Sequence, residues 1–496
     1  MLFLPDDLIA DIVVSVAAED KATAAGLCRS CKSLARVFED DVLCLTRTLI
    51  NSSEGRNVNV ALIKAAGRGH APAVRMLCST FDADVHAHHD SALFVAAREG
   101  HAETVDLLCS AYDANVHAYQ DRALIFAAKN GHVEVVDLLC GRFGADVHAN
   151  RDAALEGAAR GGHVHVVDLL CSTYGADVHA NRGDALVSAA SQGHADVVAL
   201  LCHEYAADVH TQRDRPLRTA AREGHAAVVK TLCERFGADV HALHDEALFG
   251  ACACGHVAIV DLLCGSFGAD VHAGRGEALV SAAYYGHAKV VELLCRRYGA
   301  DVHAQSDGAL IAAASCGYAD IAELLCSRFG ADVHARKDLA LRYAASNGYA
   351  DVVELLCRFG ANVHAEDDDA LYRAAYFGRT EIVEMLCGRF GVKVHARGAE
   401  ALHNAAYMGH TAIVEMLVER FGTDVHARGE IALLAAISEG HVEIAELLVG
   451  RFGADVREAL RRAEDDGADG IILGSLCALL RLRTGYGAVT VVCDQK

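Results

Sequence analysis

The sequence predicts an all-α solenoid, in which about 13 to 14 short helix pairs of one design stack side by side. One leucine returns at a step of 31 residues nine times, then 30, then 31 twice, and alanine precedes it in all units but one. Each unit also holds two short apolar segments with i, i+3, i+4 spacing, separated by glycine. Such a helix pair cannot bury its apolar stripe alone, and stacking on like neighbours does so. The repeated leucines are Leu62, Leu93, Leu124, Leu155, Leu186, Leu217, Leu248, Leu279, Leu310, Leu341, Leu371, Leu402 and Leu433.

Each unit is expected to fold as two helices joined by a glycine turn. A Val-His-Ala segment is followed by a polar link with an acid such as Asp90 or Asp245, which we expect to accept N–H bonds as a helix N-cap or in the first turn. An Ala-rich helix over 92–97 then ends at Gly100, because a left-handed helix end favours glycine. A second helix over 105–109 leads into the Gly-Ala-Asp-Val link to the next unit.

These units resemble the ankyrin repeat over about four fifths of the chain, through Ala92-Leu93, Ala96-Ala97, Gly100-His101, Val105, Leu107-Leu108 and, in most units, Gly-Ala-Asp-Val. The family's Thr-Pro-Leu-His is reduced to Ala-Leu, with Pro216 the one proline before the aligned leucine, and the link is shorter, so we expect short hairpin tips. The resemblance implies that first helices and tips line a binding groove. Short, His-tipped repeats of this style resemble those of large DNA viruses and some bacteria.

Composition narrows the classes of function. The chain has 496 residues, 53% of them apolar, with no tryptophan, three prolines and a net charge of −22, which predicts a soluble, ordered, helical protein. The charge argues against a nucleic-acid partner and against an anionic membrane surface. The sequence has no apolar run of about 18 residues, and its start carries acids but no basic region, so we expect neither a membrane span nor a signal peptide.

The nineteen cysteines follow the repeat. Eleven share one slot of the second helix, which Val418 and Val449 fill in the last two full units, so the slot is predicted to be small and apolar. Adjacent helices lie roughly 8–10 Å apart, beyond the roughly 7 Å Cα limit for a disulfide. We therefore expect reduced thiols in a reducing compartment, the cytoplasm. The eleven are Cys78, Cys109, Cys140, Cys171, Cys202, Cys233, Cys264, Cys295, Cys326, Cys357 and Cys387.

Residues 1–45 lie outside the repeat and resemble an F-box, through Leu4-Pro5, Asp7-Leu8, Ile12, Val16, Asp20, Leu27-Cys28-Arg29, Lys32 and Leu34. Cys31 stands where the family has tryptophan. The resemblance implies a three-helix segment that docks on the Skp-type adaptor of cullin–RING ubiquitin ligases, with contacts from Leu4, Pro5, Leu8, Ile12, Val16, Leu27, Cys28 and Leu34. The residues leave a second interpretation open, in which this segment is a helical cap on the solenoid.

Four segments follow from these patterns. They are an F-box-like segment at 1–45, a linker at 46–58, the repeat array at 59–456, and a C-terminal capping repeat with a tail at 457–496.

The histidines occupy two slots, twelve after valine (His86 to His426) and ten after glycine (His70 to His441). Copies in adjacent units lie about one helix spacing apart, too far to share an ion whose ligand nitrogens sit about 2.0–2.1 Å away. We expect the Gly-His residues to pin the turn between helices and the Val-His-Ala residues to line the tips. Cys28-x-x-Cys31 and Cys252-x-Cys254 lack a second ligand pair at zinc spacing. The sequence predicts no metal, no cofactor and no catalytic centre.

Residues that break the repeat mark the candidate target surface. Around units 8 to 12 the first helices gain aromatic side chains, and the Gly-His slot becomes Tyr318, Tyr349 and Arg379. Aromatic and arginine anchors are typical of binding hot spots, although large residues also fill packing gaps. The predicted target-binding residues are Tyr284, Tyr285, Tyr343, Tyr372, Tyr376, Phe377 and Tyr407.

The sequence therefore predicts a monomeric substrate receptor, in which the F-box-like segment recruits the Skp-type adaptor and the groove holds a target protein. The alternative is an ankyrin scaffold or effector with no ligase link. A third, more distant hypothesis is a metal- or thiol-reactive sensor built on the Cys and His rows.

Overall fold

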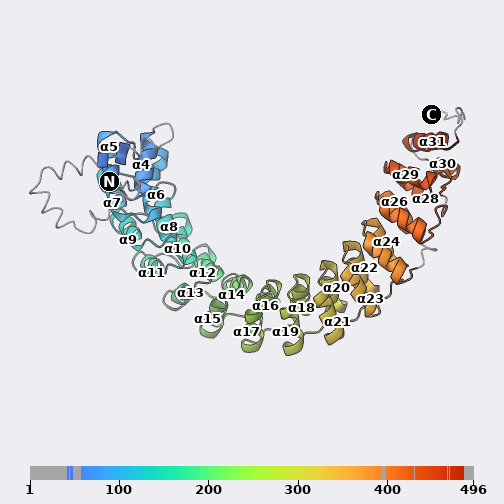
Figure 1. Ribbon diagram of the computed structural model, residues 1–496. Helices are drawn as coiled ribbons and strands as arrows, with labels where there is room; N and C mark the ends of the chain where they lie inside the picture. Colours follow the sequence, from blue (N-terminus) through green and yellow to red (C-terminus); the bar gives the residue numbers. More distant parts are fainter. Residues whose placement is uncertain are drawn as a thin grey trace, which may run out of the picture. The chain divides into compact units, whose positions relative to one another are not determined.

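The computed structural model describes residues 42–43, 45–47, 57–392, 398–428, 430–465, 467 and 470–484. Within these residues every regular element is helical, and short helices follow one another in pairs (Figure 1). The predicted all-α solenoid of repeated helix pairs is confirmed. The F-box-like residues, from Leu4 to Leu34, lie outside the described residues, and so does the Cys28-x-x-Cys31 pair.

The chain divides into two compact units, Met1–Asp239 and Val240–Lys496, which we call unit 1 and unit 2. In unit 1 the first helices of the repeats are α4 (Val58–Gly67), α6 (Ala87–Glu99), α8 (Arg122–Lys129), α10 (Ala149–Gly161), α12 (Ala180–Ser191) and α14 (Thr211–Glu223). The second helices are α5 (Ala71–Thr80), α7 (Ala102–Tyr112), α9 (Val133–Asp137) with its π-helical end η2 (Leu138–Arg142), α11 (Val164–Ser172), α13 (Ala195–His203) and α15 (Ala226–Phe236).

Unit 2 continues the same alternation. Its first helices are α16 (Ala242–Ala253), α18 (Ala273–Tyr284), α20 (Ala304–Cys316), α22 (Ala335–Asn347), α24 (Asp369–Tyr376), α26 (Gly398–Tyr407), α28 (Ile431–Ser438) and α30 (Val456–Asp465). Its second helices are α17 (Val257–Ser266), α19 (Ala288–Tyr298), α21 (Ala319–Phe329), α23 (Ala350–Arg358), α25 (Thr380–Glu384) with η3 (Met385–Arg389), α27 (Thr411–Glu415) with η4 (Met416–Arg420), α29 (Val442–Gly450) and α31 (Gly470–Thr484).

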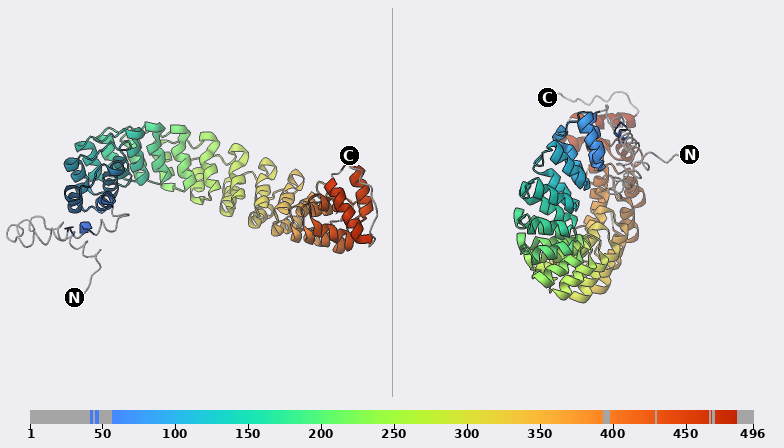
Figure 2. Two further views of the ribbon diagram at one scale, coloured as in Figure 1. Left: turned by 90° about the horizontal axis from the view of Figure 1, so that it is seen from above. Right: turned by 90° about the vertical axis from the view of Figure 1, so that its left-hand side faces the viewer.

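Within each unit the first helices form one layer and the second helices another (Figures 1 and 2). First helices of adjacent repeats pack closely because their facing residues are small: Ala96 and Ala97 are fully buried in α6. Leu93 of the first helix and Leu108 of the second are also buried, and the equivalent residues recur in the other repeats. The apolar core therefore runs through each unit between the two layers. The first-helix residues that differ from repeat to repeat, such as Tyr284 and Tyr372, lie outside this core and are exposed.

In most repeats that the structure describes, the link that leads into the first helix forms a left-handed turn, which the sequence reasoning did not anticipate. In the second repeat His88, His89 and Asp90 have φ angles of 54°, 59° and 57°. A left-handed turn costs roughly 1–2 kcal/mol for each residue with a Cβ atom. The same turn recurs in most repeats of both units, so local contacts must offset that cost.

The acid of this link provides such contacts. Asp90 lies in the first turn of α6, one of the two positions expected for it, and its equivalent Asp121 stands at the N-cap of α8 without a side-chain capping bond. The carboxylate of Asp90 accepts a hydrogen bond from His86 Nδ1 at 3.0 Å and another from the backbone N–H of Asn115 in the next repeat at 2.8 Å. Asp245 joins His241 and the N–H of Asp270 in the same way. The reversed backbone turns the carboxylate away from the helix and toward the neighbouring repeat.

The Gly-His histidines tie adjacent repeats together, consistent with the structural role expected for them. His225 donates through Nε2 to the carbonyl oxygen of Ser191, 34 residues earlier, at 2.9 Å. Its ring lies against Gly193, where a Cβ atom would be 2.6 Å from Nδ1, so the contact requires glycine there. These residues therefore fix the spacing between repeats as well as the turn within one.

Candidate functional site

The predicted aromatic residues lie on the first helices of unit 2, and most are exposed. Tyr284 ends α18 and Tyr285 follows it, with 50% and 54% of their surface exposed, and Phe377, directly after α24, is 47% exposed. Tyr343, Tyr372 and Tyr407, on α22, α24 and α26, are exposed at 37–40%, and Tyr376 is half-buried. These helices are neighbours in one packed layer. The structure thus places all seven residues on the first-helix side of unit 2, and we call them the aromatic surface.

Contacts between these side chains hold the rings in place. Tyr284 and Tyr285 meet edge to face with centroids 5.0 Å apart, and so do Tyr376 and Phe377. Such pairs restrict ring motion before any partner arrives. Helices α20 and α22 lie between these two pairs. They carry the small residues Ser315 and Ser346 at the repeat position that Tyr284 and Tyr376 occupy in α18 and α24. The two aromatic pairs therefore stand at the ends of α18 and α24, with serine at the equivalent position of α20 and α22 between them.

An arginine clamp lies within the aromatic surface. Arg342 of α22 and Arg373 of α24 both donate to Asp369, at 2.6 and 2.5 Å. Arg342 and Asp369 expose only 15% and 17% of their side chains, so water screens this network weakly. The clamp fixes α22 against α24, and with them Tyr343, Tyr372 and Tyr376.

Three residues that also break the repeat have a structural role. The rings of Tyr318 and Tyr349 lie against Gly286 and Gly317, in the place that a histidine ring takes in other repeats. Arg379 donates through Nε to the carbonyl oxygen of Ser346 at 3.0 Å. They substitute for the Gly-His contact and are not needed to explain binding.

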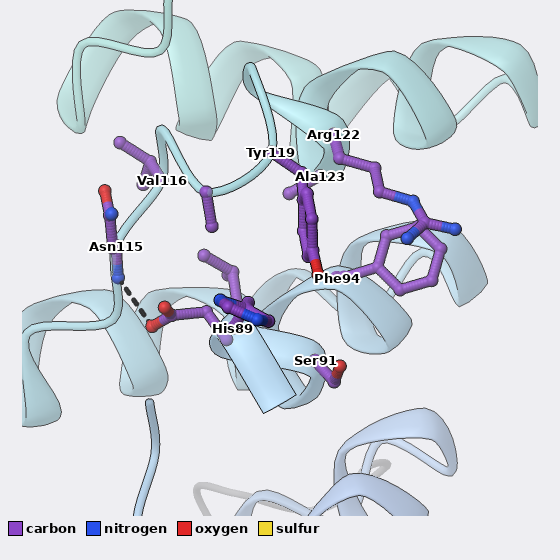
Figure 3. A pocket seen from close by; sticks show the side chains of 11 residues that line it. His89, Ser91, Phe94, Asn115, Val116, Tyr119, Arg122 and Ala123 are labelled. Carbon is purple, nitrogen blue, oxygen red and sulfur yellow. Dashed lines mark hydrogen bonds between the residues drawn. The ribbon is translucent and has the colours of Figure 1, made fainter. Parts of the chain in front are cut away.

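A second exposed cluster, in unit 1, was missed by sequence reasoning. Arg122 stacks over Phe94 at 4.2 Å, and Tyr119, 59% exposed, meets His89 at 4.9 Å (Figure 3). Arg122 also lies 5.4 Å from the centre of the Phe126 ring. The side chains of His89, Phe94, Tyr119 and Arg122 line a hollow of about 20 Å³, room for one water molecule. Phe94 and Phe126 occupy the first-helix positions that Tyr372 and Tyr343 occupy in unit 2, so the same rule applied to unit 1 would have found them.

The Val-His-Ala histidines are tied to the fold on one side. In the second repeat Nδ1 of His86 is bonded to Asp90, while 55% of the His86 side chain remains exposed. The same pair recurs as His148 with Asp152 and as His303 with Asp307. The Val-His-Ala histidines therefore line the repeat tips, as expected, and the buried acids fix the orientation of their rings.

The chemistry of the thiols and histidines is that of a structural protein. Burial raises the pKa of Cys109 and of Cys264 to about 12, so these thiols stay protonated and unreactive near neutral pH. Cys252 is buried and Cys254 is exposed, so this pair does not share one environment. Among the described residues, no three His, Cys, Asp or Glu side chains converge in a way that could hold a metal ion. In that same part of the chain, no helix has both the length and the apolar character that crossing a bilayer requires.

Comparison with known families agrees with the geometry. The family model described as ankyrin repeats (3 copies) matches residues 34–120, 115–182, 158–244, 186–275, 248–337, 310–398 and 371–459. No curated protein matches the chain. Arrays of these repeats act as modules for protein–protein interaction, and no catalytic family matches. Since the matches cover most of the chain and the helix pairs follow their period, the protein belongs to the ankyrin-repeat family.

Proposed function

We propose that this chain is a substrate receptor of a cullin–RING ubiquitin ligase, with a target protein held on the aromatic surface and a Skp-type adaptor bound by residues 1–45. The chain would act as a single copy in a reducing compartment. It would perform no bond chemistry, because holding a target beside the ligase raises their effective concentration. The observation that carries target binding is the gathering of exposed tyrosine and phenylalanine side chains on one layer of unit 2.

The chemistry of the aromatic surface supports protein binding. Tyrosine and arginine dominate binding hot spots, because they bury a large area with few rotatable bonds and keep a polar end. The rings are braced in pairs and the helices beneath them are joined by the Arg342–Asp369–Arg373 clamp. A partner therefore meets a surface that loses little side-chain entropy on binding.

The role of this surface is tested by substituting Tyr376, Phe377 and Tyr407 with alanine. A target retained by the wild-type chain is identified, purified and titrated against both proteins, and we expect at least about thirtyfold weaker binding, since the loss of even one hot-spot residue costs about 2 kcal/mol or more. A matched control removes Val442 and Ile471, two exposed apolar residues of second helices, and should bind normally. Equal affinity of the triple variant would reject the aromatic surface.

The ligase link rests on the F-box resemblance of Leu4-Pro5, Leu8, Ile12, Val16, Leu27-Cys28 and Leu34. The alternative is a scaffold or effector that binds a target without any ligase, and it predicts the same aromatic surface. The two are separated by a pull-down with purified Skp-type adaptor, comparing the full chain with a deletion of residues 1–45. Retention of the adaptor by the full chain alone supports the receptor, and no retention by either leaves the scaffold as the function.

A further inference from the structure

Three arginines occupy one slot in three successive repeats of unit 1. Arg151, Arg182 and Arg213 each stand at the second position of the left-handed link, and all three are exposed. We call them the arginine row. None of the three has a carboxylate partner among the residues that the structure describes, although the row lies in a chain with a net charge of −22.

Arginines on the second helices behave differently. Arg142 of unit 1 pairs with Asp106 of the preceding repeat, and in unit 2 Arg328 pairs with Glu292 at 2.9 Å and Arg389 with Glu354 at 2.7 Å. These cations hold adjacent repeats together and are neutralised in doing so. The arginine row performs no such task, so its charge remains available to a partner.

The arginine row is held in place through its backbone and neighbours. The carbonyl oxygen of Arg182 accepts from Thr211 Oγ1 at 2.6 Å and from Gln212 Nε2 at 3.2 Å, which joins its link to the next one. Arg151 reaches Asn181 Oδ1 at 3.4 Å, which joins it to the link after its own. The three guanidinium groups therefore stand on a connected base, about one helix spacing of 8–10 Å apart from link to link.

We propose that the arginine row binds an extended acidic segment of a partner protein. A peptide in the polyproline II conformation has three residues per turn and rises about 3.1 Å per residue, so acids at every third position share one face and recur about every 9 Å, close to the spacing of the row. Arginine binds carboxylates through paired, charge-assisted hydrogen bonds. This surface is separate from the aromatic surface and goes beyond the function proposed above.

The cluster of Tyr119, Arg122 and Phe94 lies next to the arginine row and indicates a second feature of the partner segment. Tyr119, in the link just before the row, is 59% exposed, and Arg122 beside it stacks on Phe94. Arg122 likewise has no ion-pair partner within the described part of the chain. An apolar or aromatic residue N- or C-terminal to the acidic run would find its contact here. The preferred partner is thus an acidic segment with an adjacent apolar residue.

A nucleic acid fits the row less well. Duplex DNA carries one charge per about 1.7 Å of its axis, so a strongly acidic protein repels it over a long stretch. A peptide with widely spaced acids is repelled far less. The row also has an acid beside it, because Asp184 lies two residues after Arg182, where its carboxylate accepts from the amide of Gln212 at 3.4 Å.

The test uses the full-length chain and a peptide of about 15 residues with glutamate at every third position and one terminal tyrosine, about 45 Å long in the polyproline II conformation. Its comparison peptide has the same composition with the glutamates adjacent, and a third probe is duplex DNA of similar length. Changing the arginine row to glutamine should weaken binding of the first peptide about tenfold, since exposed charge pairs add modestly. Asp184→Asn should tighten binding of the first peptide two- to threefold. A gain in affinity cannot result from misfolding, so this variant tests the proposal independently of stability.

The matched control removes three arginines from second helices of unit 1, with Arg75, Arg142 and Arg235 changed to glutamine, and should bind the peptide as the wild-type chain does. Helical circular dichroism and the melting curve show that each variant is folded. Equal loss in both triple variants, no effect of the row, or tighter binding of DNA than of the peptide would each overturn the proposal. This peptide assay does not involve the aromatic surface. Failure of the proposed target binding and failure of the proposal for the arginine row can therefore be told apart.

Discussion

The carboxylate of Asp307 accepts the backbone N–H of Asp332, 25 residues later, at 2.7 Å, while its Oδ1 also bonds His303 Nδ1 at 3.1 Å. One buried acid thus joins the histidine of its own repeat to the backbone of the next. Two repeats of the array have glycine at this position, Gly183 and Gly276, and the link there is made without a carboxylate.

We predict that Asp307→Asn lowers the free energy of unfolding by about 1 kcal/mol, because a hydrogen bond to a charged acceptor is worth more than one to a neutral amide. Asparagine keeps the size of the side chain and tolerates the left-handed backbone. Amide hydrogen exchange at Asp332 reports the change locally. Asp320→Asn, on the exposed first turn of α21, is the control and should leave that amide unchanged. Unaltered exchange at Asp332 in Asp307→Asn would contradict the role given to this acid.

Gly193 and His225 should behave as a coupled pair. An alanine at Gly193 would have to adopt a φ of 82° and place its Cβ 2.6 Å from the His225 ring, so we expect Gly193→Ala to cost about 2–4 kcal/mol from backbone and clash together. In a His225→Ala background the clash is gone and only the backbone cost remains. Urea unfolding of the two single variants and the double variant measures the coupling. Additive losses would show that the ring and the glycine do not interact.

The pair of His426 and Glu430 gives a defined pH dependence. A hydrogen bond to Glu430 raises the pKa of His426 above its ordinary value of 6.5, which burial opposes only in part. A raised pKa in the folded state means that the pair stabilises the protein fully below about pH 6.5 and that this contribution is lost as the pH rises through the folded-state pKa. Titration of the His426 ring by NMR should show the shift, and Glu430→Gln should abolish it. An ordinary pKa in the wild-type chain would refute the pair.

Alkylation should separate the cysteines by environment. Cys264 has a pKa of about 12 because of burial, so its thiolate is scarce at pH 8, whereas Cys254 is exposed on the first helix of the same repeat. We predict that iodoacetamide modifies Cys254 well before Cys264 in the folded chain, as read by peptide mass spectrometry. Cys254→Ser should remove that early product, and denaturation should make the remaining thiols react together. Early modification of Cys264 would show that its slot opens to solvent.

Much of the fold could be predicted because it is local and repeated. The leucine period and the glycines at the helix ends, such as Gly100, indicate where helices begin and end, and Ala96 with Ala97 indicates close packing. The role of Asp90 could not be predicted in this way. An acid before a helix favours an N-cap, and only the left-handed backbone, which no residue type at 88–90 requires, turns it toward Asn115.

The aromatic surface could be predicted for a related reason: a residue that departs from the repeat at an exposed helix position stands out against twelve equivalents. Phe94 and Phe126 depart in the same way, but phenylalanine in an apolar sequence is readily assigned to the core, and only the stacking of Arg122 shows them at the surface. Which first-helix residues face solvent depends on packing between repeats, which the pattern within one repeat does not specify.

The contacts that join repeats reach a fixed distance along the chain, 25 residues from Asp121 to Asp146 and 34 from His132 to Arg98. Removing or duplicating one whole period brings equivalent donors and acceptors back into register at the new junction. Gain or loss of whole repeats by recombination would therefore leave each new junction with the same hydrogen bonds between neighbouring repeats.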